Sequence, residues 1–197
     1  MLQKFVTSLN DGHTNIFFPN SFNKFMLNAE FGNYKFSFER IEGKVIITGI
    51  NKSKKHEIPL GTEIIEVNNL STNEYLEKYV NPYISRSTED FIKAYSPLLM
   101  FYQPKGTTFN IKFKKPNREV ISKKLTISPV SEKEMFSNNK EEGIFNFKWL
   151  KNKTAYIALN SFESSKIDSL FKSKLPEIKK AKGLVIDLRK NFGGSAD

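Results

Sequence analysis

The chain has 197 residues, of which 39% are hydrophobic, which is enough for one large domain or two small ones with their own cores. It has no cysteine, which excludes disulfide bonds, cysteine metal ligands and a cysteine nucleophile. The formal net charge is +10, and no stretch approaches the apolar length that a membrane span requires.

Residues 1–30 are expected to form an N-terminal helical segment. Apolar residues recur at helical spacing from Leu2 to Leu9, so residues 1–10 are predicted to be an amphipathic helix. A stop signal, Asn10-Asp11-Gly12, follows it. Gly12 is expected near the left-handed position that ends many helices.

His13 is a candidate catalytic residue because it follows this helix in the sequence Asp11-Gly12-His13-Thr14. Histidine titrates near neutral pH and can act as a general base. The alternative is a histidine that only holds the turn by a hydrogen bond. His56, the other histidine, lies among charged residues before Pro59 and is expected on a surface loop. Two isolated histidines do not predict a zinc site.

Residues 31–128 begin with a predicted hairpin. Tyr34, Phe36 and Phe38 alternate with polar residues, as in a half-buried strand. Glu42-Gly43 is the predicted turn, and residues 44–50 are the second strand. A polar loop, residues 51–57, is expected next.

Two helices and a second hairpin complete this unit. Ser71 and Glu74 have the capping-box spacing and open a helix through Val80. The sequence Ser87-Thr88-Glu89-Asp90 opens another, which Pro97 should kink or divide. Residues 106–113 and 119–127 then alternate as strands. Basic residues of this hairpin are expected on one exposed face: Lys112, Lys114, Lys115, Arg118, Lys123 and Lys124.

Residues 31–128 resemble a PDZ domain. The likeness rests on residues 106–113 and on Pro59-Leu60-Gly61-Thr62-Glu63-Ile64-Ile65-Glu66-Val67-Asn68, with threonine where aspartate is usual. PDZ domains add a peptide as a strand and capture its carboxylate on backbone N–H groups. The resemblance implies a peptide-binding loop of Phe31, Gly32, Asn33 and Tyr34. The alternative is a packing domain that only positions a catalytic part.

Residues 144–197 are predicted to start an α/β domain after a polar linker, residues 129–143. A strand at 154–159 is followed by an amphipathic helical region that Pro176 restarts and Gly183 ends. An apolar strand follows at 184–188. This order forms a βαβ unit, and the continuous apolar run predicts that its second strand is buried on both faces.

The segment after this helix carries a family resemblance. Gly183-Leu184-Val185-Ile186-Asp187-Leu188-Arg189-Lys190-Asn191-Phe192-Gly193-Gly194 resembles the core motif of the S41 peptidases, the C-terminal processing (tail-specific) and tricorn-core-like serine proteases. The Asp-Gly-His-Thr sequence at His13 resembles their N-terminal signature. The expected fold is therefore mixed α+β and α/β: a PDZ-like β-rich domain followed by the start of a ClpP/crotonase-like catalytic domain.

The resemblance implies a serine peptidase that cleaves peptide bonds through an acyl-enzyme, without metal or cofactor. It implies that Gly193 and Gly194 form the oxyanion hole, and that either His13 or a downstream lysine is the base. Asp187 and Arg189 are expected to form an ion pair that fixes the turn. The nucleophile is expected beyond Asp197, so this chain alone should be inactive. Serines within the chain lack a recognised nucleophile setting: Ser161, Ser164, Ser165 and Ser195.

Two other functions stay open at the level of sequence. One is a non-catalytic PDZ-like module that binds peptides. The other is nucleic-acid binding, suggested by the net charge of +10, but no nucleic-acid motif accompanies it and no such partner is expected. The expected partners are extended or C-terminal polypeptide segments, with homo-oligomer contacts through an open strand edge. The resemblance favours a secreted, periplasmic or cell-envelope protein.

Overall fold

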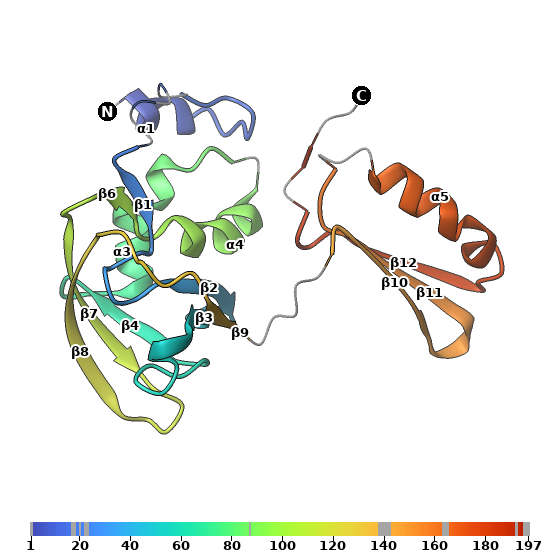
Figure 1. The fold of residues 1–197 in the computed structure, drawn as a ribbon. Coiled ribbons are helices and arrows are strands. Elements are labelled where there is room, and N and C mark those ends of the chain that lie inside the picture. Colours follow the sequence, from blue (N-terminus) through green and yellow to red (C-terminus); the bar gives the residue numbers. More distant parts are fainter. Residues whose placement is uncertain are drawn as a thin grey trace. The chain divides into compact units, whose positions relative to one another are not determined.

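A computed structural model describes residues 2–16, 19, 21, 24–86, 88–137, 143–162, 166–191 and 193–194. These residues belong to two compact units, Met1–Asn138 and Asn139–Asp197 (Figure 1). In the described residues, no helix combines the length and apolar character needed to cross a membrane. The mixture of helices with mostly antiparallel strands confirms the predicted mixed α and β class.

An antiparallel sheet with the strand order β2-β3-β4-β7-β8 is the centre of the first unit (Figure 1). The bounds are β2 (Phe36–Ile41), β3 (Lys44–Asn51), β4 (Glu63–Val67), β7 (Thr108–Lys114) and β8 (Val120–Thr126). Both predicted hairpins are present. Their sheet also includes β5 (Leu70–Ser71), paired with β4, and β9 (Met135–Ser137), paired with β3.

Left-handed residues make the tight turns of this sheet. Glu42 and Gly43 have φ angles of 49° and 79° between β2 and β3. Asn68 and Asn69 have φ angles of 51° and 65° between β4 and β5. Two consecutive positive φ angles match the twist of flanking strands, and asparagine and glycine adopt them at low cost. The Glu42-Gly43 turn therefore lies where the sequence predicts it.

Among the described residues, the helices of the first unit are α1 (Leu2–Thr7), α3 (Thr72–Tyr79) and α4 (Glu89–Leu99). Both hydrogen bonds of the predicted capping box between Ser71 and Glu74 are formed at α3. Thr88 caps α4 by accepting a hydrogen bond from the N–H of Phe91, while Ser87 lies outside the described residues. α4 continues through Pro97 to Leu99, so Pro97 does not divide the helix. The helices pack on the sheet, α4 against β2 and α3 against β4.

Short elements connect these parts. They are η1 (Lys52–Lys54), η2 (Asn81–Tyr83), and a two-stranded antiparallel sheet of β1 (Met26–Asn28) and β6 (Tyr102–Pro104).

The end of α1 corrects the prediction about Gly12. Asn10, with a φ angle of 54°, takes the left-handed position after the helix, and its N–H donates to the carbonyl of Thr7 at 3.2 Å. Asparagine adopts this conformation readily, so glycine is not needed. The apolar positions Leu2 and Phe5 are exposed in this unit.

A cluster of phenylalanine rings fills the core of the first unit. Phe101, which is completely buried, contacts three rings at centroid distances of 5.1 Å (Phe109), 5.3 Å (Phe31) and 5.7 Å (Phe38). Tilted and edge-on contacts of this kind add to the free energy of apolar burial. The cluster joins residues of both hairpins to Phe101, which lies two residues after the end of α4.

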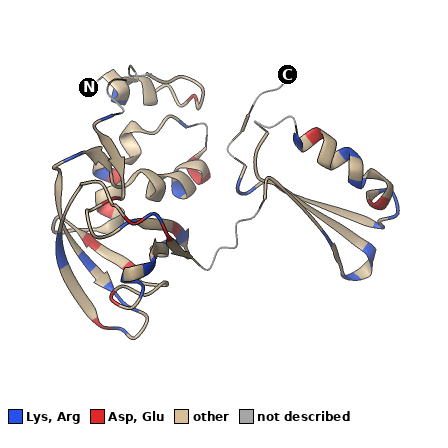
Figure 2. Ribbon diagram, viewed as in Figure 1, with Lys and Arg blue, Asp and Glu red and all other residues tan. Residues whose placement is uncertain are grey.

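The predicted single basic face of the second hairpin is wrong. Lys112 pairs with Ser122 across the strands, whereas Lys123 pairs with Ile111. Because side chains alternate between faces, Lys123 lies on the core-facing side with Ile111. Figure 2 shows acidic residues interspersed among the basic ones of this unit, and Lys112 forms an ion pair with Glu66 at 2.9 Å.

The predicted linker at 129–143 contains structure that its composition does not indicate. The strand β9 pairs residues 135–137 with the end of β3. Glu132 accepts hydrogen bonds from the Asn51 side chain and the Ser53 N–H, both at 2.9 Å. Long-range pairing with β3 thus orders a stretch that has no periodicity of its own.

In its described residues, the second unit is a three-stranded sheet with the order β10-β11-β12 and one helix. Its elements are β10 (Phe145–Leu150), η3 (Lys151–Lys153), β11 (Thr154–Leu159), α5 (Lys166–Ile178) and β12 (Gly183–Asp187). β11 and β12 are parallel and joined through α5, which confirms the βαβ unit. β10 adds an antiparallel strand, and α5 continues through Pro176 without a restart.

The burial predicted for β12 is wrong in this unit. Leu184, Val185 and Ile186 are 47%, 41% and 50% exposed. β12 is the last strand in the described sheet, so β11 pairs with only one of its edges. The apolar run therefore belongs to an edge strand here, whereas Ala155 and Ile157 of central β11 are fully buried.

Candidate active site

The chain turns sharply after β12, and Asn191 holds this turn. Its Nδ2 donates to the carbonyl of Leu159, at the end of β11, at 2.9 Å. Its Oδ1 accepts the N–H of Gly193 at 2.8 Å. The N–H of Phe162 donates to the carbonyl of Gly193 at 2.9 Å. Asn191 therefore links the Gly-Gly turn to the neighbouring parallel strand.

Gly193 and Gly194 have φ angles of 103° and 152°, which non-glycine residues rarely adopt. Such a turn can present N–H groups to a developing oxyanion. In this conformation the N–H of Gly193 already donates to Asn191. To bind an oxyanion, this N–H would have to exchange that partner. The oxyanion role of both glycines stays a prediction.

Asp187 and Arg189 form the expected ion pair at the end of β12. The guanidinium donates to Asp187 Oδ1 at 2.9 Å and to Oδ2 at 2.6 Å. The hydroxyl of Tyr156 also donates to Oδ2, at 2.5 Å. Arg189, and then Tyr156, hold the pKa of the Asp187 carboxyl well below its usual range. The same carboxylate raises the pKa of Tyr156. Through these contacts, the Asp187 carboxylate fixes the end of β12.

His13 lies in a turn organised by Asp11. The Asp11 carboxylate accepts the backbone N–H of His13 at 3.1 Å and the hydroxyl of Thr14. The hydrogen bonds from Thr14 and His13 lower the pKa of Asp11. His13 Nδ1 lies 3.6 Å from Asp11 Oδ1, and the ring is 99% exposed. A carboxylate beside Nδ1 can orient an imidazole for base catalysis, and the same contacts also serve a purely structural turn.

The candidate residues fall in both units. His13 belongs to the first unit, and Gly193 and Gly194 belong to the second. Ser161 is described and half-buried, whereas Ser164, Ser165 and Ser195 lie outside the described residues. In the described ranges, no group of three or more His, Asp or Glu side chains is arranged to hold a metal ion.

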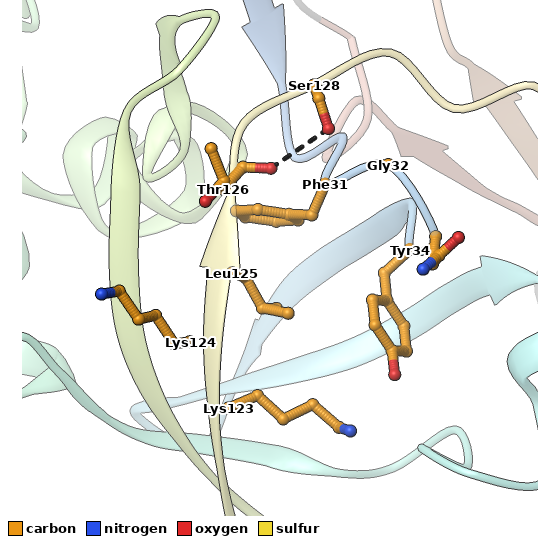
Figure 3. Close-up of a pocket in the computed structure, with 9 residues that line it drawn as sticks. Phe31, Gly32, Tyr34, Lys123, Lys124, Leu125, Thr126 and Ser128 are labelled. Carbon is orange, nitrogen blue, oxygen red and sulfur yellow. Dashed lines mark hydrogen bonds between the residues drawn. The ribbon is translucent and has the colours of Figure 1, made fainter.

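The predicted peptide-binding loop lines an open pocket of about 460 Å³ in the first unit (Figure 3). The other wall is the end of β8 and the residues after it. The lining residues are Phe31, Gly32, Asn33, Tyr34, Lys123, Lys124, Leu125, Thr126 and Ser128. The structure thus brings the loop together with a strand that the sequence analysis did not connect to it.

The loop N–H groups are already hydrogen-bonded. Phe31 N donates to Tyr34 O and Asn33 N donates to Phe31 O, both at 2.7 Å. Gly32 N donates to Ser128 O at 2.9 Å. Carboxylate capture on these three groups would require those bonds to open. Phe31 is 5% exposed and Tyr34 8% exposed, so both side chains also serve the core.

A charged cluster at the pocket rim was not predicted. The Tyr34 hydroxyl and Lys123 Nζ each donate to Glu57 Oε1 at 2.6 Å. Lys54 Nζ lies 3.5 Å from Glu57 Oε2. Lys123, and then Tyr34, lower the pKa of Glu57 to about 2. One feature of the sequence could have indicated this cluster. Lys123 alternates with Ile121 and Leu125, so it lies on the same face of the strand as these two inward-facing residues.

Comparisons with known proteins find a family match to the end of the chain and a similar fold. The sequence model of peptidase family S41 matches residues 153–197. A structure of mature CPAF complexed with lactacystin matches 99% of this chain at 14% identity, with a TM-score of 0.57. A crystal structure of a CPAF mutant also matches 99% of the chain at 14% identity, with a TM-score of 0.59. The chain spans 46% and 47% of those two chains. No curated protein sequence matches this chain.

Proposed function

We propose that this chain is the amino-terminal part of a serine peptidase of family S41, whose sequence model matches residues 153–197. The reaction is peptide-bond hydrolysis through an acyl-enzyme, and the substrates are extended or C-terminal polypeptide segments. The observation that carries this proposal is the Gly193-Gly194 turn, which follows a parallel strand and is anchored by Asn191. The nucleophilic serine is assigned to the part of the protein outside this chain.

The proposed roles follow from what acyl transfer needs. The tetrahedral intermediate carries a negative charge on the former carbonyl oxygen, and backbone N–H groups stabilise it without reorganising. Gly193 and Gly194 are proposed as these donors. His13 is proposed as the general base or as a residue that lines the site, with Asp11 holding its ring. A base of this kind contributes about 10²- to 10⁴-fold to the rate.

The experiment compares variants of the full-length protein on a quenched fluorogenic peptide. His13→Ala should lower kcat by at least about 10²-fold if His13 is the base. His56→Ala is the matched control, because His56 is the other histidine and should leave kcat unchanged. A serine-directed fluorophosphonate should label the protein once and abolish hydrolysis. Hydrolysis that survives complete labelling would contradict the serine mechanism.

The second candidate function is a non-catalytic peptide-binding module. The pocket between residues 31–34 and β8 is the observation that favours this function. A binding role also needs no nucleophile. The same full-length protein tests this alternative. Saturable peptide binding without hydrolysis or fluorophosphonate labelling would support the module and overturn the peptidase.

A further inference from the structure

The edge of β8 presents a row of backbone groups that point away from the sheet. The N–H of Ile127 donates to Thr107 O at 2.7 Å, and the N–H of Lys115 donates to Glu119 O at 2.8 Å. The backbone hydrogen-bonding groups of residues 119 and 127 therefore point toward β7. Hydrogen bonding alternates along an antiparallel strand, so residues 120, 122, 124 and 126 direct their N–H and C=O groups outward.

The chain itself uses this outward edge at one point. Ser128 N donates to Glu30 O at 3.0 Å, and Gly32 N donates to Ser128 O at 2.9 Å. These bonds form a parallel bridge between Phe31 and Ser128. Residues 30–32 thus begin to add a strand to the edge, and the turn at Asn33 then takes the chain away. The pocket in Figure 3 begins where this segment leaves the edge.

The remaining edge is unpaired by backbone within the described ranges. No described residue accepts the N–H of Ser122, Lys124 or Thr126 in a backbone hydrogen bond. These three residues are exposed, while Leu125 between them is 7% exposed. An incoming strand would therefore meet the free N–H groups of Ser122, Lys124 and Thr126 beside the buried Leu125, while the Thr126 carbonyl also accepts a hydrogen bond from Ser128 Oγ at 3.3 Å (Figure 3).

The charges beside the β8 edge indicate which kind of strand would bind there. Lys124 is exposed on the outer face and has no ion-pair partner among the described residues. Lys123 and Lys54 share the single carboxylate of Glu57 at the inner face. A second copy of β8 would place like charges opposite one another, which is destabilising. Acidic side chains on the added strand would instead complement both faces.

We propose that the edge of β8 from Ser122 to Thr126 binds an extended acidic polypeptide segment as an added strand. Its main chain pairs with the outward groups of Lys124 and Thr126, and its acidic side chains lie beside Lys124 and Lys123. This site rests on the proposed function only in that the ligand is a polypeptide. It differs from carboxylate capture by the loop, because it needs neither a free C-terminus nor the engaged N–H groups of Phe31, Gly32 and Asn33.

The first test is binding of end-blocked heptapeptides, measured by fluorescence anisotropy. One peptide repeats Glu-Glu-Val, which places Glu on both faces of an added strand, and the other repeats Lys-Lys-Val. The Glu peptide should bind at least about tenfold more tightly to the wild-type chain. Lys124→Glu should reverse that preference. Lys114→Glu is the matched control, since Lys114 is also an exposed lysine of this hairpin but does not line the pocket. Equal affinities for both peptides, or equal effects of the two substitutions, would overturn the proposal.

The second test needs no variant. Amide hydrogen exchange should slow at least about tenfold at Ser122, Lys124 and Thr126 when the Glu peptide is bound. The inward amides of Leu125 and Ile127 are protected in both states and serve as internal controls. Protection at residues 31–34 instead would assign the peptide to the loop and contradict the edge site. Protection that depends on protein concentration without peptide would indicate a second copy.

These outcomes are separate from those of the peptidase proposal. Alternating protection together with an absence of hydrolysis by the full-length protein would retain the edge site and remove the catalytic function. Hydrolysis without any protection along β8 would retain the catalytic function and remove the edge site.

Discussion

The carboxamide of Asn191 accepts the N–H of Gly193 at 2.8 Å while donating to the carbonyl of Leu159 at 2.9 Å. One side chain thus satisfies a donor in the Gly-Gly turn and an acceptor at the end of β11. Leu159 is buried, so its carbonyl would be costly to leave without a partner, and the bond to the exposed Gly193 adds a second restraint on this turn conformation. Asn191 is therefore a positioning residue for the turn proposed to bind the oxyanion.

Replacement of Asn191 should separate its two hydrogen bonds. Asn191→Ala removes both, so the Gly193 amide should exchange at least about tenfold faster by NMR. Asn191→Asp keeps the acceptor for Gly193 but loses the donor to Leu159, and Gly193 should stay protected. In the full-length protein, Asn191→Ala should lower kcat on the order of 10²-fold with little change in KM, because geometry and not binding is lost. Equal exchange in all three proteins would contradict this assignment.

Gly32→Ala should destabilise the first unit through a contact as well as through its backbone. Gly32 has a φ angle of 70°, and a Cβ there would lie 2.9 Å from Ser128 Oγ. Gly43, with a φ angle of 79° and open space around its Cβ position, is the matched control. Each substitution should cost about 1–2 kcal/mol for the left-handed conformation, and Gly32→Ala should cost more. Urea unfolding measures the difference, which Ser128→Gly should remove from the Gly32 variant.

The ion pair of Glu57 predicts a defined pH dependence. Lys123 and Tyr34 lower its pKa from 4.5 to about 2, so the folded state binds that proton less readily than the unfolded state. The resulting stabilisation is complete above about pH 4.5, weakens as the pH falls, and is lost below about pH 2. The pair is partly exposed, so its contribution should be about 1 kcal/mol or less.

Glu57→Gln measures this contribution directly. The difference in unfolding free energy between wild type and variant should be constant from pH 6 to pH 8 and shrink between pH 4.5 and pH 3. Added salt should reduce it. A difference that grows as the pH falls would contradict the assigned sign.

Ser96→Ala is expected to stabilise the first unit. Ser96 is fully buried in α4, and its hydroxyl has no hydrogen-bond partner among the described residues. Removing an unpaired buried hydroxyl should raise the unfolding free energy by about 1 kcal/mol. Ser85→Ala is the contrasting control and should lower the unfolding free energy, because the buried Ser85 hydroxyl donates to Thr14 O at 2.6 Å. Thermal unfolding should move the two variants in opposite directions.

Local chemistry explains the predictions that were confirmed. The Ser71–Glu74 capping box and the Glu42-Gly43 turn each depend on residues within a few positions of one another. The alternation of Phe36 and Phe38 likewise specifies a buried face without knowledge of what covers it. The parallel pair of β11 and β12 follows from strand, helix and strand in short succession.

Long-range pairing decided what the sequence left open. Composition alone marks 129–143 as a loop, yet pairing with β3 makes β9 from its residues. The face of Lys123 depends on the β7–β8 register, which also places it beside Glu57, 66 residues away in the chain. The exposure of β12 depends on the strands beside it in this unit.

By itself, the sequence indicated most of the helices and strands, the Glu42-Gly43 turn, the S41-like motif and the candidate residues His13, Gly193 and Gly194, because these depend on nearest neighbours along the chain. Only the tertiary structure decided that Asn191 binds Gly193, that the loop N–H groups are engaged, and that the β8 edge is open. The physical reason is that hydrogen-bond partners and burial are set by which distant segments meet, and no local pattern encodes that pairing.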